Sequence, residues 1–230
     1  MDDLSHQARQ SLLDAALPIA AFEGWTQKTL RDAAAKVGLP KGAEALYFPE
    51  GPLELLKFWA DGCDQHVEQV LSELDQSSMK IRDKVTAGIM ARLEAIGRHD
   101  LAAKRAAARL ALPDGAGQAA AQSWAAADTI WRAIDDTSTD ANYYSKRTIL
   151  SGVIASSLLA WIADNDPEKP KGRAFVEARI ANVMQFETFK WNMKARTKDW
   201  PNPVNLLGKL RYGTGFKRRR KCSSDISQPY

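Results

Sequence analysis

Hydrophobic and polar positions repeat along almost the whole chain at helical spacing, and the strict alternation typical of strands is nearly absent. Ala, Leu, Glu, Lys and Arg, which favour helices, dominate these segments. The pattern predicts about nine helices. They cover, approximately, residues 5–22, 26–38, 41–45, 52–74, 79–97, 101–111, 116–134, 141–164 and 170–196. The sequence therefore predicts an all-α fold.

Several helix boundaries have a local chemical cause. Thr26 can cap the second predicted helix with its hydroxyl, and Pro52 suits the first position of the fourth. Pro18 falls inside the first helix, where a proline removes a backbone donor and predicts a kink.

One long segment carries no charge. Residues 148–163 are uncharged, and the run is closed by Arg147 and Asp164. A membrane-spanning helix needs about 20 apolar residues. We therefore predict a mostly buried helix, at a dimer interface, along an apolar cavity or simply in the core.

The N-terminal elements have the order of a helix-turn-helix. A break at Gly24 and Trp25 separates the first two helices, and Gly38 separates the second from the third. This order resembles the N-terminal domain of TetR-type regulators. It implies a three-helix unit over residues 1–52, a larger helical ligand-binding and dimerisation domain over 53–197, and a tail over 198–230.

The residues that would read DNA are missing from this outline. DNA recognition requires positive charge that neutralises phosphates and hydrogen-bond donors at base edges. Lys28 and Lys41 alone supply little positive charge. Glu44 would present the wrong charge to a polyanion. The departures from the TetR pattern are Pro40, Ala43, Glu44, Ala45 and Gly51. We therefore do not expect DNA binding.

Charge is concentrated at the C-terminus. The chain carries a net charge of +4, yet eleven Lys and Arg and only two Asp lie in residues 190–230. Basic residues beside apolar ones suit an anionic membrane surface, whereas a solvated tail with nonspecific affinity for polyanions fits the same composition. The candidate membrane-surface residues are Leu206, Leu207, Leu210, Phe216, Lys217, Arg218, Arg219, Arg220 and Lys221.

No catalytic motif is found. The two cysteines and three histidines fit no metal or redox spacing, and no Glu-x-x-His pair or glycine-rich phosphate loop occurs. We predict a protein without catalytic residues, metal or cofactor, and not an enzyme. Residues 1–6 are acidic and polar rather than basic and apolar, which predicts a complete chain in the bacterial cytoplasm.

Four segments together resemble the coenzyme Q biosynthesis protein 9 family, the lipid-binding accessory proteins of ubiquinone synthesis. They are the Gly24–Trp25 pair and residues 46–55, 131–147 and 173–180, and the resemblance covers roughly residues 8–195. Its most specific part is the Ser-Thr-Asp-x-x-Tyr-Tyr-x-Lys-Arg segment at 138–147.

The resemblance implies a TetR-like homodimer that does not bind DNA and is associated peripherally with the inner membrane. It also implies an apolar pocket for an isoprenoid quinone intermediate or a phospholipid. The partner would be the di-iron demethoxyubiquinone hydroxylase, to which the chain presents its ligand. An alternative is a TetR-type transcriptional repressor that senses an apolar effector.

By the same resemblance, the partner would dock on Asp140, Tyr143, Tyr144, Lys146 and Arg147. Tyr and Arg are frequent interface anchors because each combines a large area with a polar tip. A purely local interpretation remains open, in which Asp140 caps the helix, Tyr144 packs inward and Arg147 pairs with Asp140 or Asp136.

Apolar and Trp residues on three successive helices are candidates for the wall of a lipid cavity. Stripes of this kind form ordinary core more often than ligand pockets. The candidate lipid-binding residues are Trp124, Trp131, Leu150, Ile154, Leu158, Trp161, Val183 and Phe186.

Overall fold

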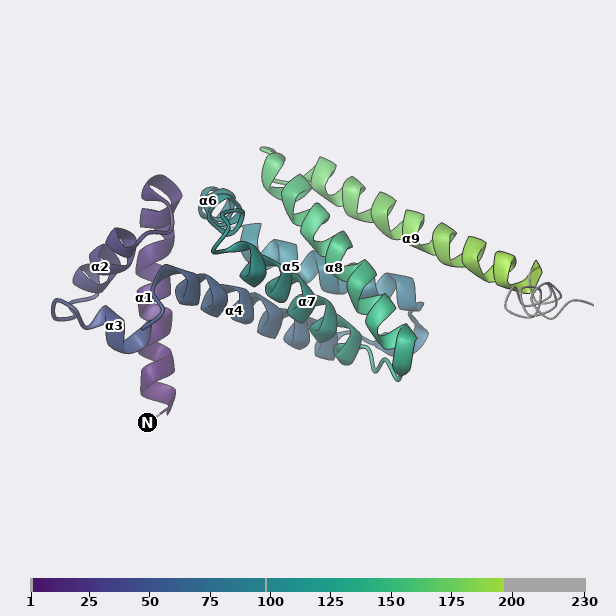
Figure 1. The fold of residues 1–230 in the computed structure, drawn as a ribbon, viewed down its shortest axis with the longest axis horizontal. Helices are drawn as coiled ribbons and strands as arrows, with labels where there is room; N and C mark the ends of the chain where they lie inside the picture. The colour runs from purple at the N-terminus through teal and green to yellow at the C-terminus, as the bar shows by residue number, and fades with distance from the viewer. Residues whose placement is uncertain (1, 98, 197–230) are drawn as a thin grey trace, which may run out of the picture. The chain divides into compact units, whose positions relative to one another are not determined.

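The computed structural model describes the backbone of residues 2–97 and 99–196, and the side chains of residues 4–97, 99–139 and 142–183. This part of the chain is helical and contains no strand, so the predicted all-α class is confirmed. The helices are α1 Asp2–Glu23, α2 Gln27–Lys36, α3 Glu44–Tyr47, α4 Pro52–Glu73, the short 3-10 helix Gln76–Ser78, α5 Ile81–Gly97, α6 Asp100–Leu110, α7 Ala116–Ala133, α8 Asp140–Ala163 and α9 Pro170–Arg196 (Figure 1).

The predicted boundaries of α2 and α4 are found. Thr26 is the N-cap of α2, and its side chain accepts a hydrogen bond from the backbone of Thr29 at 3.1 Å. Pro52 begins α4 after Gly51, whose φ of 75° is a conformation that favours glycine. Pro18 lies inside the 22-residue helix α1.

Contacts divide the chain into a compact unit of residues 1–185 and a second unit of residues 186–230. The first unit has two apolar clusters, one around α1–α3 and one around α4, α5, α7 and α8. The N-terminal cluster includes Leu55 of α4 and Ala102 of α6, so the three-helix unit shares its core with the helices that follow. The predicted boundary at residue 52 stays a prediction.

Trp25 belongs to the N-terminal cluster, and its neighbour Trp59 packs against both clusters. The Trp25 indole Nε1 donates a hydrogen bond to the carbonyl oxygen of Ala102 at 3.0 Å, which satisfies its buried polar atom. Its ring stacks on Trp59 of α4, with 5.4 Å between centroids. Trp25, in the turn after α1, is therefore held against both α4 and α6.

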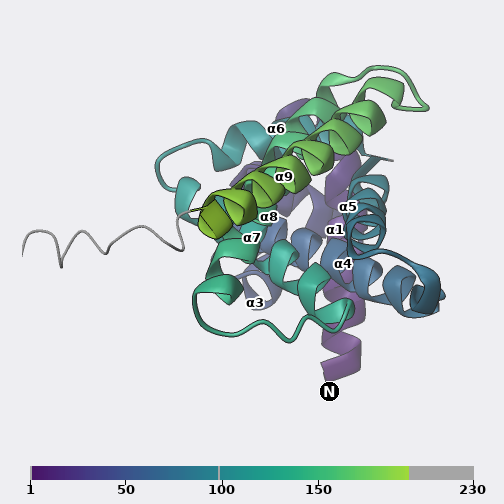
Figure 2. The ribbon, with the colours of Figure 1, turned by 90° about the vertical axis from the view of Figure 1, so that its right-hand side faces the viewer.

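Helix α8 lies beside α7 (Figures 1 and 2), and Val176 and Ile180 of α9 belong to the same apolar cluster as residues of α8. Trp161 is buried against the start of α9, where a Cβ added at Gly172 would stand 2.9 Å from its ring. Residues Asn142–Ala163 of α8 are long and apolar enough to cross a membrane, a property that core helices share. Leu150, Ile154 and Ile162 of this segment are buried in the core. Only 39% of its apolar window is buried, however, and Leu159 is 58% exposed, so the predicted mostly buried helix is not found in the single chain.

Candidate functional site

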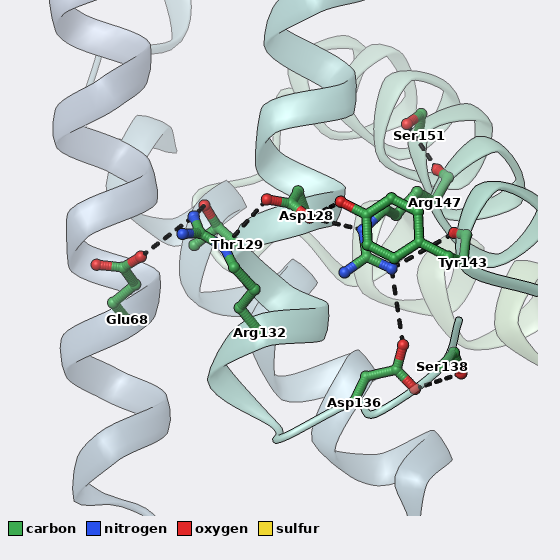
Figure 3. Close-up of polar contacts among 9 residues, drawn as sticks. All are labelled: Glu68, Asp128, Thr129, Arg132, Asp136, Ser138, Tyr143, Arg147 and Ser151. Carbon is green, nitrogen blue, oxygen red and sulfur yellow. Dashed lines mark hydrogen bonds and ion pairs between the residues drawn. The ribbon is translucent and has the colours of Figure 1, made fainter. Parts of the chain in front are cut away.

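The predicted docking residues lie at the start of α8, and Arg147 is the most buried of those whose side chains the structure describes. Its guanidinium Nε donates a hydrogen bond to Asp128 Oδ1 of α7 at 2.6 Å, and its Nη1 lies 3.7 Å from Asp136 Oδ2. The side chain is 2% exposed. Arg147 therefore acts inside the protein, where it joins α8 to α7 and to the turn between them (Figure 3).

Tyr143 belongs to the same internal network. Its hydroxyl donates to Asp128 Oδ1 at 3.2 Å, and its ring centroid lies 3.4 Å from the Arg147 guanidinium carbon (Figure 3). A guanidinium over an aromatic face is attracted by the negative face of the ring, most strongly away from water. Tyr143 therefore positions Arg147.

Lys146 completes the network on the turn side. Its Nζ donates to Asp136 Oδ1 at 2.7 Å and lies 4.8 Å from the ring centroid of Trp131. Burial opposes ionisation of Asp136, but hydrogen bonds from Lys146 and Ser138 outweigh it and hold the pKa of the carboxyl below its ordinary value. Asp136 is therefore a stable anion that pairs with two cations, Lys146 and Arg147.

Tyr144 is the exposed member of the pair, and its ring meets the Tyr143 ring edge to face, with 5.2 Å between centroids. It is 63% exposed, and its ring lies beside Trp124 of α7, with 6.3 Å between centroids. Neighbouring positions on an α-helix are about 100° apart around its axis, so Tyr143 can be held inside while Tyr144 presents its ring to solvent.

Trp124 lies at an open groove of about 430 Å³ between α7 and α8, which we call the α7–α8 groove. Its lining consists of small side chains and one indole ring, namely Ala119, Ala120, Ser123, Trp124, Thr148, Ser151, Gly152 and Ala155. The Ser151 hydroxyl donates to the carbonyl oxygen of Arg147 at 2.7 Å, so its polarity is satisfied within the helix. The result is an exposed apolar surface next to an exposed tyrosine.

The local interpretation of the docking residues is therefore right in one part and wrong in two. Arg147 does pair internally, with Asp128 and Asp136. Tyr144 does not pack inward, and Thr139 rather than Asp140 occupies the N-cap position of α8. The side chain of Asp140 lies outside the described residues.

The predicted lipid-wall residues are distributed over three environments. Leu150, Ile154 and Trp161 are core, and Trp131 and Val183 pack against that core. Trp124 lines the α7–α8 groove, whereas Leu158 lines a small cavity elsewhere. Phe186 has no described side chain. These residues therefore do not line a single cavity in the described part of the chain.

Sequence reasoning missed most residues of that small cavity, which lies among α4, α5, α6, α7 and α8. Its lining includes Trp59, Cys63, Arg92 and Gln122. Burial raises the pKa of the Cys63 thiol to about 11. No spacing rule predicts that these residues meet, because they come from different helices. The only sequence signal for the cavity was that two polar residues, Arg92 and Gln122, lie on helices otherwise rich in apolar residues.

The helix-turn-helix face also differs from its prediction in one respect. Glu44 is 5% exposed, so it does not present its charge to solvent, as the sequence suggested; Leu46 is the exposed side chain of α3. Lys28 is engaged by Glu23 and Asp32 at 2.6 and 2.7 Å. Helix α3 has four residues, about one turn, which gives little length for the major groove.

In the parts of the chain that the structure describes, no three His, Cys, Asp or Glu side chains lie close enough to hold a metal ion. The candidate membrane-surface residues in 206–221 lie outside the described residues and stay a prediction.

A sequence model of the COQ9 family matches residues 116–187. The ubiquinone biosynthesis protein COQ9, mitochondrial, of Bos taurus is 27% identical over 185 residues, which cover 77% of this chain and 58% of that protein. The Drosophila melanogaster COQ9 is 25% identical over 217 residues, covering 91% of this chain and 66% of its own. The chain is similar to the COQ9 proteins over most of its length. The predicted resemblance is thus confirmed.

The fold is also found in a solved structure. A TetR transcriptional regulator from Nitrosomonas europaea superposes with a TM-score of 0.63 over 78% of this chain and 99% of its own, at 16% sequence identity. At this identity the likeness shows the fold alone, and it confirms the predicted TetR-like architecture.

The COQ9 match coincides with the site. Residues 116–187 contain α7, α8 and the first two thirds of α9, and therefore the whole α7–α8 groove, Tyr144 and the Arg147 network. The part of the sequence most typical of the family is thus the part that builds the exposed aromatic surface.

Two qualifications of the predictions follow from these relatives. The chain spans about 58% of the length of the Bos taurus protein. The COQ9 relatives are mitochondrial, which contradicts the prediction of a bacterial cytoplasmic protein at the inner membrane. That prediction was wrong because it relied on residues 1–6, whose composition does not determine a compartment when the relatives are longer proteins.

Proposed function

We propose that this chain is a non-catalytic accessory protein of ubiquinone biosynthesis. It binds an isoprenoid or quinone intermediate and presents it to the hydroxylase that acts on the demethoxy precursor of ubiquinone. The proposal takes its pathway from the names of the COQ9 relatives. The observation that carries it is the open α7–α8 groove beside the exposed ring of Tyr144.

The groove suits an isoprenoid chain in size and chemistry. Ligand sites for small molecules occupy about 300–1,000 Å³ and are mostly apolar. The groove, at about 430 Å³, falls within that range, whereas the small cavity among α4–α8, at about 70 Å³, does not. When an isoprenoid binds in the groove, its apolar surface leaves water and contacts alanine methyl groups and the Trp124 ring. This transfer lowers the free energy.

An open groove also suits presentation. A ligand there has one side against α7 and α8 and the other side uncovered, so a docked partner would complete its enclosure. Tyr144 lies at the start of the groove-lining helix and offers an aromatic anchor to that partner. Arg147 and Asp128 beneath it fix the angle between the two helices. The homodimer that the resemblance implies stays a prediction.

The test fills the groove with a side chain. Gly152 lines the groove, and a Cβ there meets nothing within 4 Å. Gly152→Leu should remove co-purified isoprenoid lipid, measured by native mass spectrometry and solvent extraction. Gly62→Leu is the matched control, because Gly62 is also a helical glycine with open space around its Cβ. Both changes replace a helical glycine with a better helix former.

Equal lipid content in the two variants would contradict the proposed site. Absence of any isoprenoid from gently purified unmodified protein would contradict the lipid-binding role itself.

A further inference from the structure

The end of α2, the loop after it and helix α3 form an exposed surface that carries apolar side chains. We call residues 36–46 the α2–α3 tip. Leu46 is 82% exposed and Val37 is 37% exposed. The tip lies on the side of α2 and α3 that faces away from α4 (Figure 1). A single exposed leucine is ordinary on a protein surface, so its surroundings decide whether it belongs to a binding site.

The backbone that carries Leu46 is held in place. Gly42 has a φ of 88°, which favours glycine, and the Leu46 amide donates a hydrogen bond to the carbonyl oxygen of Ala43 at 3.0 Å. Phe48, two residues further, is buried, and its ring lies beside that of Phe58 on α4, with 5.8 Å between centroids. Leu46 is therefore presented to solvent by a turn that is anchored in the core.

The exposed charges of the tip have one sign. Between residues 33 and 49 the charged residues are Lys36, Lys41 and Glu44. Both lysines are exposed, whereas the side chain of Glu44 is buried. Among the side chains that the structure describes, no ion pair engages either lysine; Lys28 takes the carboxylates of the neighbouring helices instead. The tip thus presents apolar side chains and positive charge without negative charge.

An anionic membrane surface fits this combination. Lysines near the head groups are attracted by anionic lipids, and an apolar side chain is stabilised at the boundary between head groups and acyl chains. A bilayer imposes no shape on the protein, so a projecting leucine suits it. A specific protein interface, by contrast, covers about 800 Å² on each partner with about 20 residues or more, and the tip spans only residues 36–46.

Double-stranded DNA is the other polyanion that the lysines attract. The large exposed side chain of α3 is Leu46, which offers no hydrogen bond to a base edge. DNA therefore uses only the charge of the tip, whereas an anionic bilayer uses both the charge and the leucine.

We propose that the α2–α3 tip binds an anionic phospholipid bilayer, with Leu46 inserted at the level of the head groups and Lys36 and Lys41 beside the lipid phosphates. This contact is separate from the basic residues 206–221 and does not rest on the ligand or the partner of the proposed function. Two lysines and one leucine make a weak contact, so it is measured most directly at the tip itself.

A dye at the tip reports insertion. Ala45→Cys is made in the full chain with Cys222→Ser and labelled with nitrobenzoxadiazole, whose emission rises in an apolar environment. Position 45 is exposed and Cys63 is buried, which directs the label to the tip. Emission should rise with vesicles of phosphatidylcholine and phosphatidylglycerol in equal parts, but not with phosphatidylcholine alone. Gln65→Cys, labelled on the exposed face of α4, should show no rise with either.

The contribution of the leucine is measured by co-sedimentation with the same anionic vesicles. Leu46→Ser should weaken binding of the full chain by about tenfold, the effect of withdrawing one leucine from an apolar environment. Leu112→Ser is the matched control, because Leu112 is 50% exposed and lies outside the tip. It should leave binding unchanged.

The contribution of the charge needs a control with the same net charge. Lys36→Gln with Lys41→Gln should weaken vesicle binding by about tenfold or more. Lys80→Gln with Lys84→Gln removes two charges at the start of α5 instead. A difference between these variants cannot come from the general attraction of the chain to the bilayer, because their net charges are equal.

Unchanged emission with the anionic vesicles would overturn the proposal, and so would an equal rise with both kinds of vesicle. A rise with double-stranded DNA in place of vesicles would assign the tip to nucleic acid and overturn it as well. Equal binding by the tip variants and their controls would have the same consequence. The dye measurement stands even if a variant fails to fold. No isoprenoid enters these experiments, so their result is independent of the Gly152→Leu result in the groove.

Discussion

Tyr143 and Arg147 donate to the same oxygen, Asp128 Oδ1, at 3.2 and 2.6 Å, while the guanidinium lies against the tyrosine ring. One carboxylate on α7 thus holds two side chains one turn apart on α8. Because this arrangement is internal, the segment most typical of the COQ9 relatives is in part a structural support. Tyr144, between them in sequence, is 63% exposed.

Loss of Arg147 should destabilise the fold. Arg147→Met removes the buried cation between Asp128 and Asp136, which then keep only the more exposed Arg132 and Lys146. Breaking a buried pair on one side costs up to about 3 kcal/mol. Arg132→Met is the matched control, because Arg132 also pairs with Asp128, at 3.0 Å, but is 63% exposed. An exposed pair contributes about 0–1 kcal/mol. Urea unfolding of both variants measures the difference, and equal losses would contradict the internal role of Arg147.

The exposed tyrosine should matter for partner binding and not for stability. Tyr144→Ala is expected to weaken recovery of the demethoxyubiquinone hydroxylase in a pull-down by at least tenfold, as for an interface anchor. Phe22→Ala removes another exposed aromatic ring, at the end of α1, and should have no effect. Both variants should unfold at the same urea concentration as the unmodified chain. Normal recovery with Tyr144→Ala would remove the proposed anchor.

Asp136 should make part of the stability depend on pH. Its folded-state pKa lies below the ordinary Asp value of 3.8, so its contribution is fully present above that value and is lost as the pH falls through the folded-state pKa. The stability difference between the unmodified chain and Asp136→Asn should therefore be constant near neutral pH and shrink in strong acid. A difference that grew on acidification would contradict the assignment.

The Cys63 thiol should be inert in the folded protein. Burial raises its pKa to about 11, so almost no thiolate forms at neutral pH. In a Cys222→Ser background, iodoacetamide should label Cys63 only after denaturation. Rapid labelling without denaturant would show that the cavity it lines is open to reagents.

The fold was predictable wherever a local cause sets the structure. Helical periodicity placed α4 through α9 to within a few residues, and the caps at Thr26 and Pro52 were recognisable because capping is chemistry between neighbours in sequence. The uncharged run at 148–163 indicated the buried face of α8, since burial affects composition, but it did not indicate the exposed face that carries Leu159.

The direction of single side chains was decided by tertiary structure. Arg147 has its partner 19 residues earlier, on another helix, so helical spacing within α8 could not identify Asp128. Packing between helices also decided three other positions. It turned Tyr143 inward, buried Glu44 and brought Arg92 and Gln122 to one cavity. A sequence determines which face of a helix is apolar, but the neighbour that a given side chain meets depends on how the helices pack, and contacts between distant residues fix that packing.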